Sequence, residues 1–169
     1  MTVRAAVEAV RQTLEDDPAR AVVRLRTEAR LVGVTQVQVR MGGYEVTVDE
    51  PKSVGGTGAG ANPIQLALAA LGSCQAITYR YWAEILGVRL DGVTVRVEGD
   101  VDMRGFFGFD ASARPGVTGV TCLVTLEGPE DPARYQELTA AVDAHCPVLD
   151  IFSGPVPVER HVEVASGPI

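Results

Sequence analysis

The stretch of residues 62–86 constrains the fold most, because it reads as one long helix with almost no polar face. Asn62 can cap its start, Pro63 suits its first turn, and Gly87 is a natural stop. Nearly every side chain before Tyr79 is apolar or small, and a helix that is apolar all round is buried. A chain of 169 residues can hardly surround so long a helix by itself. The sequence therefore predicts a homodimer in which this helix packs against its copy.

Runs of alternating polar and apolar residues predict antiparallel strands around this helix. Such runs cover residues 23–31, 37–41, 44–48, 93–101, 120–126 and 156–164. The Gly42-Gly43 link between the second and third runs indicates a β-hairpin. Further helices are expected over residues 2–15 and from Asp131-Pro132 to His145. This order predicts an α+β fold, a mostly antiparallel sheet wrapped around the long central helix and a second helix.

Length and composition fit one globular domain spanning residues 1–169. Hydrophobic residues make up 46% and charged residues 22%. The longest strongly apolar run, around residues 66–71, is far shorter than the roughly 20 residues of a membrane-spanning helix. The N-terminus lacks the apolar core of a signal peptide, so a cytoplasmic location without membrane contact is expected. A net charge of −7 argues against nucleic acid as a partner.

Two of the three cysteines lie on predicted core helices. Cys74 lies several turns into the long helix, and Cys146 ends the later helix, 72 residues further on. Such a pair suggests a redox function, since a disulfide in a reducing compartment is more often transient than structural. Either thiol could also be an inert core residue, because free cysteine is among the most buried residue types. Cys122, on one face of a predicted strand, reads as core packing.

The sequence lacks the motifs of several other kinds of functional site. The glycine-rich segment 51–61 precedes a helix, as a phosphate-binding loop would, but it lacks the Gly-Lys-Ser/Thr ending of a P-loop. It therefore reads as a flexible connector. The chain contains neither a Cys-x-x-Cys pair for zinc nor the Gly-x-Ser-x-Gly motif of a serine hydrolase. No resident cofactor or metal is expected.

With these features in view, the chain resembles the OsmC/Ohr family of osmotically inducible and organic hydroperoxide resistance proteins, in its OsmC-like branch. The matching pieces are the glycine-rich loop into Asn62-Pro63, the Leu-Ala-Ala-Leu-Gly-Ser-Cys74 helix, and Ala144-His145-Cys146-Pro147-Val148. The loops around residues 49–56 and 98–105 look similar as well. The resemblance covers about residues 35–160 and leaves residues 1–20 outside it as an N-terminal extension.

The resemblance implies an intertwined homodimer in which each central helix is buried between the sheets. It also implies thiol-dependent reduction of organic hydroperoxides, either alkyl or lipid. By position, Cys74 matches the peroxidatic cysteine and Cys146 the resolving cysteine. An external dithiol of the lipoyl or thioredoxin type would reduce the resulting disulfide, and no resident cofactor is implied.

One position departs from the family pattern. Family peroxidases usually place a glutamate directly after the Asn-Pro pair, where it orients an arginine over the reactive thiol; here that position is Ile64. Arg40, on the predicted hairpin, is the candidate for this arginine. The next candidates after it are three arginines of the preceding predicted strand: Arg24, Arg26 and Arg30.

Three functions stay open on the sequence. The first is the thiol peroxidase. The second is a non-catalytic or weakly catalytic protein that binds an apolar or thiol-containing small molecule at the dimer cleft. The third is a purely structural dimer with buried cysteines. Loss of the glutamate at Ile64 favours the second, and retention of both thiols favours the first.

Overall fold

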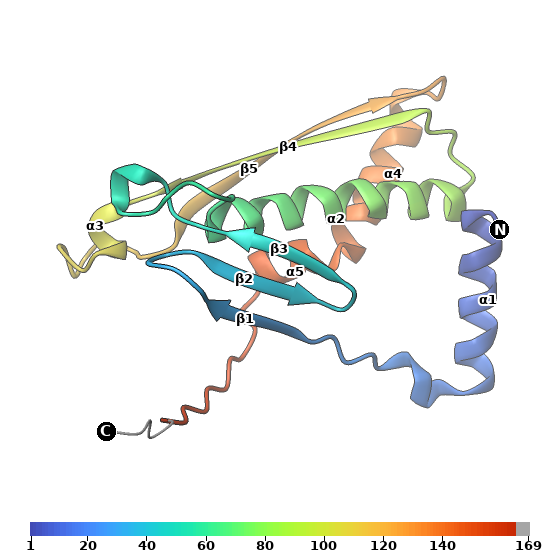
Figure 1. Cartoon of the computed structure of the whole chain (residues 1–169). Coiled ribbons are helices and arrows are strands. Elements are labelled where there is room, and N and C mark those ends of the chain that lie inside the picture. The colour runs from blue at the N-terminus through green and yellow to red at the C-terminus, as the bar shows by residue number, and fades with distance from the viewer. Residues whose placement is uncertain (165–169) are drawn as a thin grey trace.

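The computed structural model describes residues 1–164, which form the helices and strands of Figure 1. In chain order these are α1 (Val3–Asp16), the 3-10 turn η1 (Pro18–Ala21), β1 (Thr27–Leu31), β2 (Val37–Met41), β3 (Tyr44–Val48), the 3-10 turn η2 (Lys52–Val54), α2 (Pro63–Leu86), β4 (Gly92–Val101), α3 (Met103–Phe106), β5 (Val117–Glu127), α4 (Pro132–His145) and α5 (Pro147–Ser153). The predicted α+β class and the antiparallel pairing of the strands are confirmed. No helix within residues 1–164 has both the length and the apolar character needed to span a membrane.

Helix α2 begins and ends where the sequence predicts. The Asn62 side chain accepts a hydrogen bond from the Gln65 amide at 2.8 Å, and the Gln65 side chain accepts one from the Asn62 amide at 3.0 Å. This reciprocal capping box satisfies two donors that the first turn would otherwise leave unpaired. Gly87 ends the helix in the left-handed conformation, at φ 64°, which an L side chain rarely adopts.

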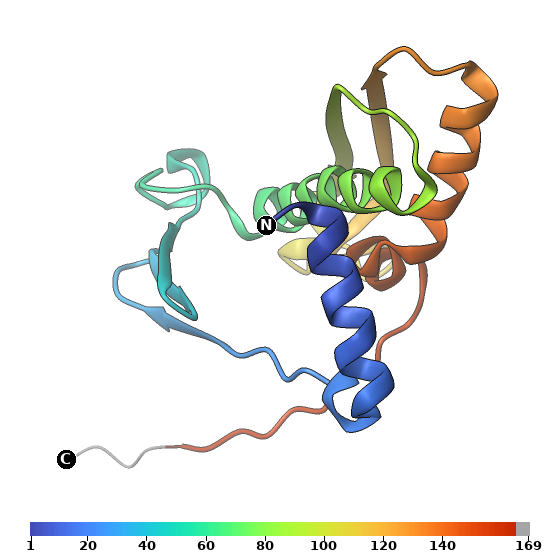
Figure 2. The same ribbon diagram turned by 90° about the vertical axis from the view of Figure 1, so that its right-hand side faces the viewer.

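The strands form two separate antiparallel sheets, one with the order β1-β2-β3 and one made of β4 and β5. Strands β2 and β3 are the predicted hairpin, with Met41 paired to Tyr44 across the Gly42-Gly43 turn. The long β4-β5 ribbon lies along α2, whereas the three-stranded sheet stands away from that body (Figure 2). The family resemblance implies that α2 is buried between the sheets of a dimer, and this enclosure is not seen within one chain.

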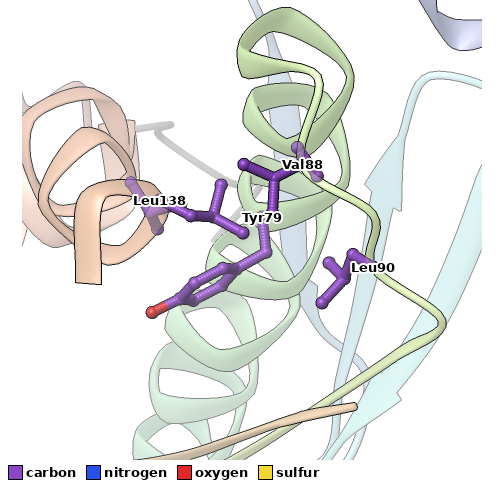
Figure 3. Close-up of a cluster of buried hydrophobic side chains, with 6 residues drawn as sticks. Tyr79, Val88, Leu90 and Leu138 are labelled. Carbon is purple, nitrogen blue, oxygen red and sulfur yellow. The ribbon is translucent and has the colours of Figure 1, made fainter. Parts of the chain in front are cut away.

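The hydrophobic core gathers around the C-terminal half of α2. Tyr79 and Ala83 of α2 pack with Leu138 and Val142 of α4, and the chain leaving α2 adds Val88 and Leu90. Figure 3 shows Tyr79 and Leu138 meeting between the two helices, with Leu90 on the other side of the tyrosine. The Tyr79 hydroxyl lies 3.2 Å from the Thr139 hydroxyl, so its one polar atom is paired.

The first predicted strand is shorter than expected. Strand β1 covers only Thr27–Leu31, and the residues just before it pair with no strand. It forms an edge of its sheet, and all of its residues are exposed. The apolar side chains of this alternating pattern have no core to face within the chain. They are Val23, Leu25 and Leu31.

The strand predicted over residues 156–164 is wrong for this chain. These residues are exposed and belong to neither sheet, because alternation alone does not supply a partner strand. The sequence analysis also missed helix α5, which precedes them. Pro147 in its first turn and Gly154 just past its end are typical helix boundaries and could have indicated it.

Candidate active site

Cys74 and Cys146 meet at the junction of three helices. Cys74 lies in α2, and Cys146 is the corner residue between the end of α4 and the start of α5. The Cys146 thiol lies 3.5 Å from the Cys74 sulfur, and both cysteines are free. A disulfide requires about 2.05 Å between sulfurs, so a small side-chain movement separates this contact from a covalent bond. The structure therefore brings together the two thiols that the sequence singled out.

The two thiols differ in accessibility. Cys146 is only 2% exposed, whereas Cys74 is half-buried. Burial raises the pKa of the Cys146 thiol, and the neighbouring Cys74 acts in the same direction, while amides at the start of α5 oppose them. Cys146 is thus kept as a neutral thiol behind a more accessible partner.

His145 supports the helix corner beside Cys146. Its ring lies against Trp82 of α2, with 4.1 Å between the ring centroids. Its Nδ1 lies 2.8 Å from the Ala141 carbonyl, which can only accept, so Nδ1 carries the hydrogen. The imidazole therefore packs the end of α4 against α2, and its hydrogen bond goes to the backbone rather than to a sulfur.

The arginine candidates lie on the three-stranded sheet. Arg40 donates to Glu45 at 2.7 Å across the β2-β3 hairpin and is exposed. Its hydrogen bond goes to this carboxylate and to neither sulfur. Arg24 and Arg26 lie in the segment before β1, Arg30 lies in β1, and all three are exposed. The activation of Cys74 by Arg40 stays a prediction.

A cavity of about 610 Å³ lies between the N-terminal half of α2, β5 and α5; we call it the α2–β5–α5 cavity. Ile64 lines it, at the position where the family peroxidases carry glutamate. Cys122 faces inward from β5, as predicted, but it lines this cavity and is half-buried rather than sealed in the core. Arg114, in the loop before β5, also lines it, and no sequence motif marked that residue.

Helix α5 connects this cavity to the thiol pair. Leu149 and Ser153 line the α2–β5–α5 cavity on one side and a smaller pocket beside Cys146 on the other. Leu71, in the cavity wall, lies one turn before Cys74 on α2. An apolar compartment thus adjoins a half-buried thiol that faces a buried partner thiol.

The amino-acid sequence of the chain matches the profile of a known protein family. The profile of the OsmC-like proteins matches residues 56–160, which include Asn62-Pro63 and both cysteines. The chain belongs to the OsmC family. Among curated proteins, no sequence matches it.

Solved structures of OsmC-like and organic hydroperoxide resistance proteins have a similar fold. An organic hydroperoxide resistance protein from Legionella pneumophila aligns at 21% identity and a TM-score of 0.61, over 79% of this chain and 92% of its own. An OsmC-like protein from Mycoplasma pneumoniae aligns at 17% identity and a TM-score of 0.69, over 78% and 89%. A putative organic hydroperoxide resistance protein from Vibrio cholerae aligns at 18% identity and a TM-score of 0.56, over 79% and 87%. At such identities the likeness shows the fold.

A buried carboxylate holds the glycine-rich loop of this OsmC-like chain in place. Asp49 is 1% exposed, and its oxygens accept hydrogen bonds from the Thr35 hydroxyl at 2.6 Å, the Thr57 hydroxyl at 2.6 Å and the Ala59 amide at 3.1 Å. The amides of Glu50 and Thr57 add two more. These donors, the Thr35 hydroxyl above all, hold the pKa of Asp49 well below its usual range. The loop expected to be a flexible connector is thus tied down immediately before α2.

Gln75 is an unusual neighbour for the Cys74 thiol. It directly follows Cys74, is 4% exposed, and its Oε1 has no hydrogen-bond partner among residues 1–164. An unpaired buried amide oxygen is costly, because it gives up its bonds to water without replacement. Nothing in the sequence pattern of α2 distinguished this position from the apolar ones around it.

Proposed function

We propose that this protein is a cysteine-dependent peroxidase that reduces organic hydroperoxides. The observation that carries the proposal is the 3.5 Å contact between the half-buried Cys74 and the buried Cys146. A Cys74 thiolate attacks the distal oxygen of the hydroperoxide, the O–O bond breaks, and the alkoxide leaves as the alcohol after taking a proton. Cys74 is left as a sulfenic acid.

The second thiol completes the cycle. The sulfur of Cys146 attacks the sulfenic sulfur, forming a disulfide and releasing the hydroxyl group as water. An external dithiol of the lipoyl or thioredoxin type then reduces the disulfide by thiol exchange. The difference in burial supports this order, since the accessible sulfur has to meet the substrate, whereas the buried one is shielded from it and reacts with the neighbouring sulfenic acid.

Attack on a peroxide requires a thiolate, and a neighbouring cation favours the thiolate form of a cysteine. It lies about three turns into α2, and the effect of the helix dipole fades within the first turn. Arg40 is our candidate for this cation. Its present partner Glu45 would have to release it or move with it towards the thiol.

We also propose a homodimer. Along α2, the apolar side chains of Ile77, Tyr81 and Ile85 recur every four residues and are exposed. The edge strand β1 and the tail over residues 156–164 expose further apolar side chains. A second copy covering these surfaces would bury on the order of 2,000 Å² or more, as permanent dimers do. Light scattering at low micromolar concentration tests this, and a folded 17.9 kDa monomer contradicts it.

The alternative function is a protein that binds an apolar or thiol-containing small molecule with little or no turnover. The apolar side chain of Ile64, where a peroxidase of the family carries a carboxylate, favours it. The similar Vibrio cholerae protein holds a molecule of captopril, which carries a thiol, in one of its active sites.

A peroxidase assay separates the two functions. Cumene hydroperoxide and tert-butyl hydroperoxide are supplied with a dithiol reductant, and consumption of the peroxide is followed. We expect slow turnover that Cys74→Ser abolishes and that Ser73→Ala, a change of one oxygen on the adjacent residue, leaves intact. Non-reducing peptide mapping after mild oxidation should give a disulfide between Cys74 and Cys146. Absence of any turnover dependent on Cys74 would favour the binding protein.

A further inference from the structure

A small pocket lies at the corner where α4 gives way to α5, and we call it the Cys146 pocket. Its volume is about 300 Å³, and the residues of its lining that matter here are Asp143, His145, Cys146, Leu149, Asp150 and Ser153. Cys74 does not belong to this lining. Cys146 therefore lies between the pocket and Cys74, whose sulfur is 3.5 Å from its own.

This placement has a consequence once the two thiols are joined in a disulfide. A disulfide opens when a thiolate attacks one of its sulfurs and the other sulfur leaves. Burial raises the pKa of the Cys146 thiol, and a thiol with a raised pKa leaves more slowly. Attack on Cys146 avoids this difficulty, because Cys74 is then the sulfur that leaves. The pocket that Cys146 lines is the place from which such an attack can come.

His145 brings a proton acceptor to the same pocket. Its Nδ1 carries the hydrogen that is donated to the Ala141 carbonyl at 2.8 Å, so Nε2 of the neutral ring keeps a lone pair. Among residues 1–164, Nε2 has no hydrogen-bond partner. The bond to Ala141 and the contact with Trp82 fix the orientation of the ring. Histidine is the side chain that most often serves as a general base.

The other charged groups of the pocket are acidic. Asp143 of α4 and Asp150 of α5 are exposed, and neither forms an ion pair among the residues that the structure describes. From α2 the imidazole meets Trp82, which does not titrate. Two carboxylates at one small pocket repel an anionic molecule and attract a cationic one.

We propose that the Cys146 pocket binds the dithiol that reduces the disulfide, with His145 as the base that takes the proton of the attacking thiol. Asp143 and Asp150 select a neutral or cationic dithiol over an anionic one. The inference rests on the proposed function for the origin of the disulfide. It deepens that function by assigning the site of the reductant, the sulfur that it attacks and the charge that it carries.

The reduction takes two steps. In the first, the thiol gives its proton to Nε2 of His145, its sulfur bonds to the Cys146 sulfur, and Cys74 leaves as a thiolate. In the second, the other thiol of the reductant loses its proton to water and attacks the reductant sulfur that is bonded to Cys146. Cys146 leaves and takes the proton back from His145. The dithiol ends as a cyclic disulfide, oxidised by the two electrons that the protein disulfide gains.

The test follows this reduction alone. Diamide, instead of a peroxide, joins Cys74 to Cys146 in the full chain carrying Cys122→Ala, and dithiothreitol then reduces the disulfide in a stopped-flow instrument. Trp82 is the only tryptophan and lies against His145, so its fluorescence reports the reaction. A protonated imidazole quenches a neighbouring indole, and the same signal therefore gives the titration of His145 in the oxidised protein.

With His145 present, the rate should level off above the pH at which Trp82 fluorescence reports that the imidazole has lost its proton. His145→Gln should lower the rate at pH 7 by roughly tenfold or more, since only a few per cent of an ordinary thiol is ionised there. Its rate should then rise about tenfold per pH unit, as the thiolate of the free dithiol does. Added imidazole should restore part of the rate. His161→Gln is the matched control, since it removes the only other histidine, which is exposed and pairs with Glu159, and it should change nothing.

Three dithiols test the effect of charge: dithiobutylamine is cationic, dithiothreitol neutral and dimercaptosuccinate anionic. Each rate is divided by the rate at which the same dithiol reduces 2-hydroxyethyl disulfide, which cancels its intrinsic reactivity. We expect the normalised rates to fall in that order, and Asp143→Asn combined with Asp150→Asn to remove most of the difference.

The attacked sulfur is identified with 2-mercaptoethanol, which has no second thiol. After rapid alkylation of the freed cysteine, peptide mapping should find the mercaptoethanol on Cys146 and the alkyl group on Cys74. The reverse assignment, an unchanged pH dependence in His145→Gln, or a thiol pair that diamide does not join would overturn the inference. Because diamide makes the disulfide, each outcome can be read even if the chain reduces no peroxide.

Discussion

The two halves of α2 differ in how their surroundings are packed. In the C-terminal half, Tyr79 and Ala83 lie in a closed core with Leu138 and Val142 of α4, which are fully buried. The N-terminal half faces the α2–β5–α5 cavity with Ile64, Leu68 and Leu71. Cys74 lies where the two halves meet. One continuous helix therefore carries a packed region that holds the fold together and an open region that leaves room close to Cys74.

This difference has a physical reason in the neighbouring elements. Helix α4 packs on the C-terminal half, and its side chains fill the space against α2. The short helix α5 and a strand rich in glycine at its start, with Gly116 and Gly119 nearby, lie beside the N-terminal half. Small residues and a short helix leave volume unfilled, which a large side chain would otherwise occupy.

The largest expected effect is on the free energy of unfolding, when a leucine beside each half of α2 is changed to alanine. Leu138→Ala should lower the free energy of unfolding by about 2–5 kcal/mol, because it opens a new cavity in a closed core. Leu68→Ala should cost less, roughly 1–2 kcal/mol, since this side chain already borders open volume and less packing is lost. Denaturant unfolding of both variants measures the difference. Equal losses would mean that the cavity is filled in the assembled protein.

The open half can also be tested by restoring a carboxylate. Ile64→Glu should raise peroxidase turnover by roughly 10²–10³, the usual effect of one preorganised electrostatic contact. The new carboxylate would have to orient an arginine, with Arg40 the candidate and Arg114 lining the same cavity wall as residue 64. Steady-state kinetics with cumene hydroperoxide measures the change, and Ile64→Gln, of the same length without charge, is the matched control. A gain of the same size in Ile64→Gln would exclude the electrostatic explanation.

Asp49 holds the glycine-rich loop that leads into the N-terminal half of α2, and this predicts how the stability of the protein depends on pH. The folded pKa of Asp49 lies below its ordinary value, so the carboxylate stabilises the fold above about pH 4 and this contribution is lost as the pH falls further. Asp49→Asn should lower stability at neutral pH and remove part of the acid dependence, because an amide cannot accept from all the donors around it. Thermal unfolding from pH 3 to 7 measures both effects, with Asp91→Asn on the exposed surface as control. Parallel curves for the wild type and Asp49→Asn would refute the assignment.

The closed half was easier to predict from the sequence than the open half. In the closed half, the stop at Gly87 and the helix after Asp131-Pro132 were predicted, because their signals are local. The cap at Asn62, where the open half begins, was predicted for the same reason. The pairing of Cys74 with Cys146 followed from their positions on two core helices and from family resemblance. Local sequence could not predict the cavity, because its volume depends on which side chains are absent from three separate elements.

The two failed strand predictions have a related cause. Residues 23–26 and 156–164 alternate as strands do, but a strand exists only with a partner edge, and a single chain supplies none to them. The position of Arg114 in the cavity wall could not be predicted for another reason. It stands in a loop without periodicity, and only the packing of α3 against that loop brings it to the cavity wall.

The smallest expected effect concerns Gln75, at the boundary between the halves. Its buried Oε1 has no hydrogen-bond partner among residues 1–164, so Gln75→Met, a change of similar length and helix propensity, should stabilise the protein by about 1 kcal/mol. Gln136→Met on the exposed face of α4 is the matched control and should change stability by less than about 0.5 kcal/mol. Denaturant unfolding gives both values, and turnover is measured alongside. Loss of turnover in Gln75→Met with unchanged stability would mean that this oxygen receives a hydrogen bond from the substrate or from a second copy. Gln75 would then belong to the open half and its chemistry, not to the closed core.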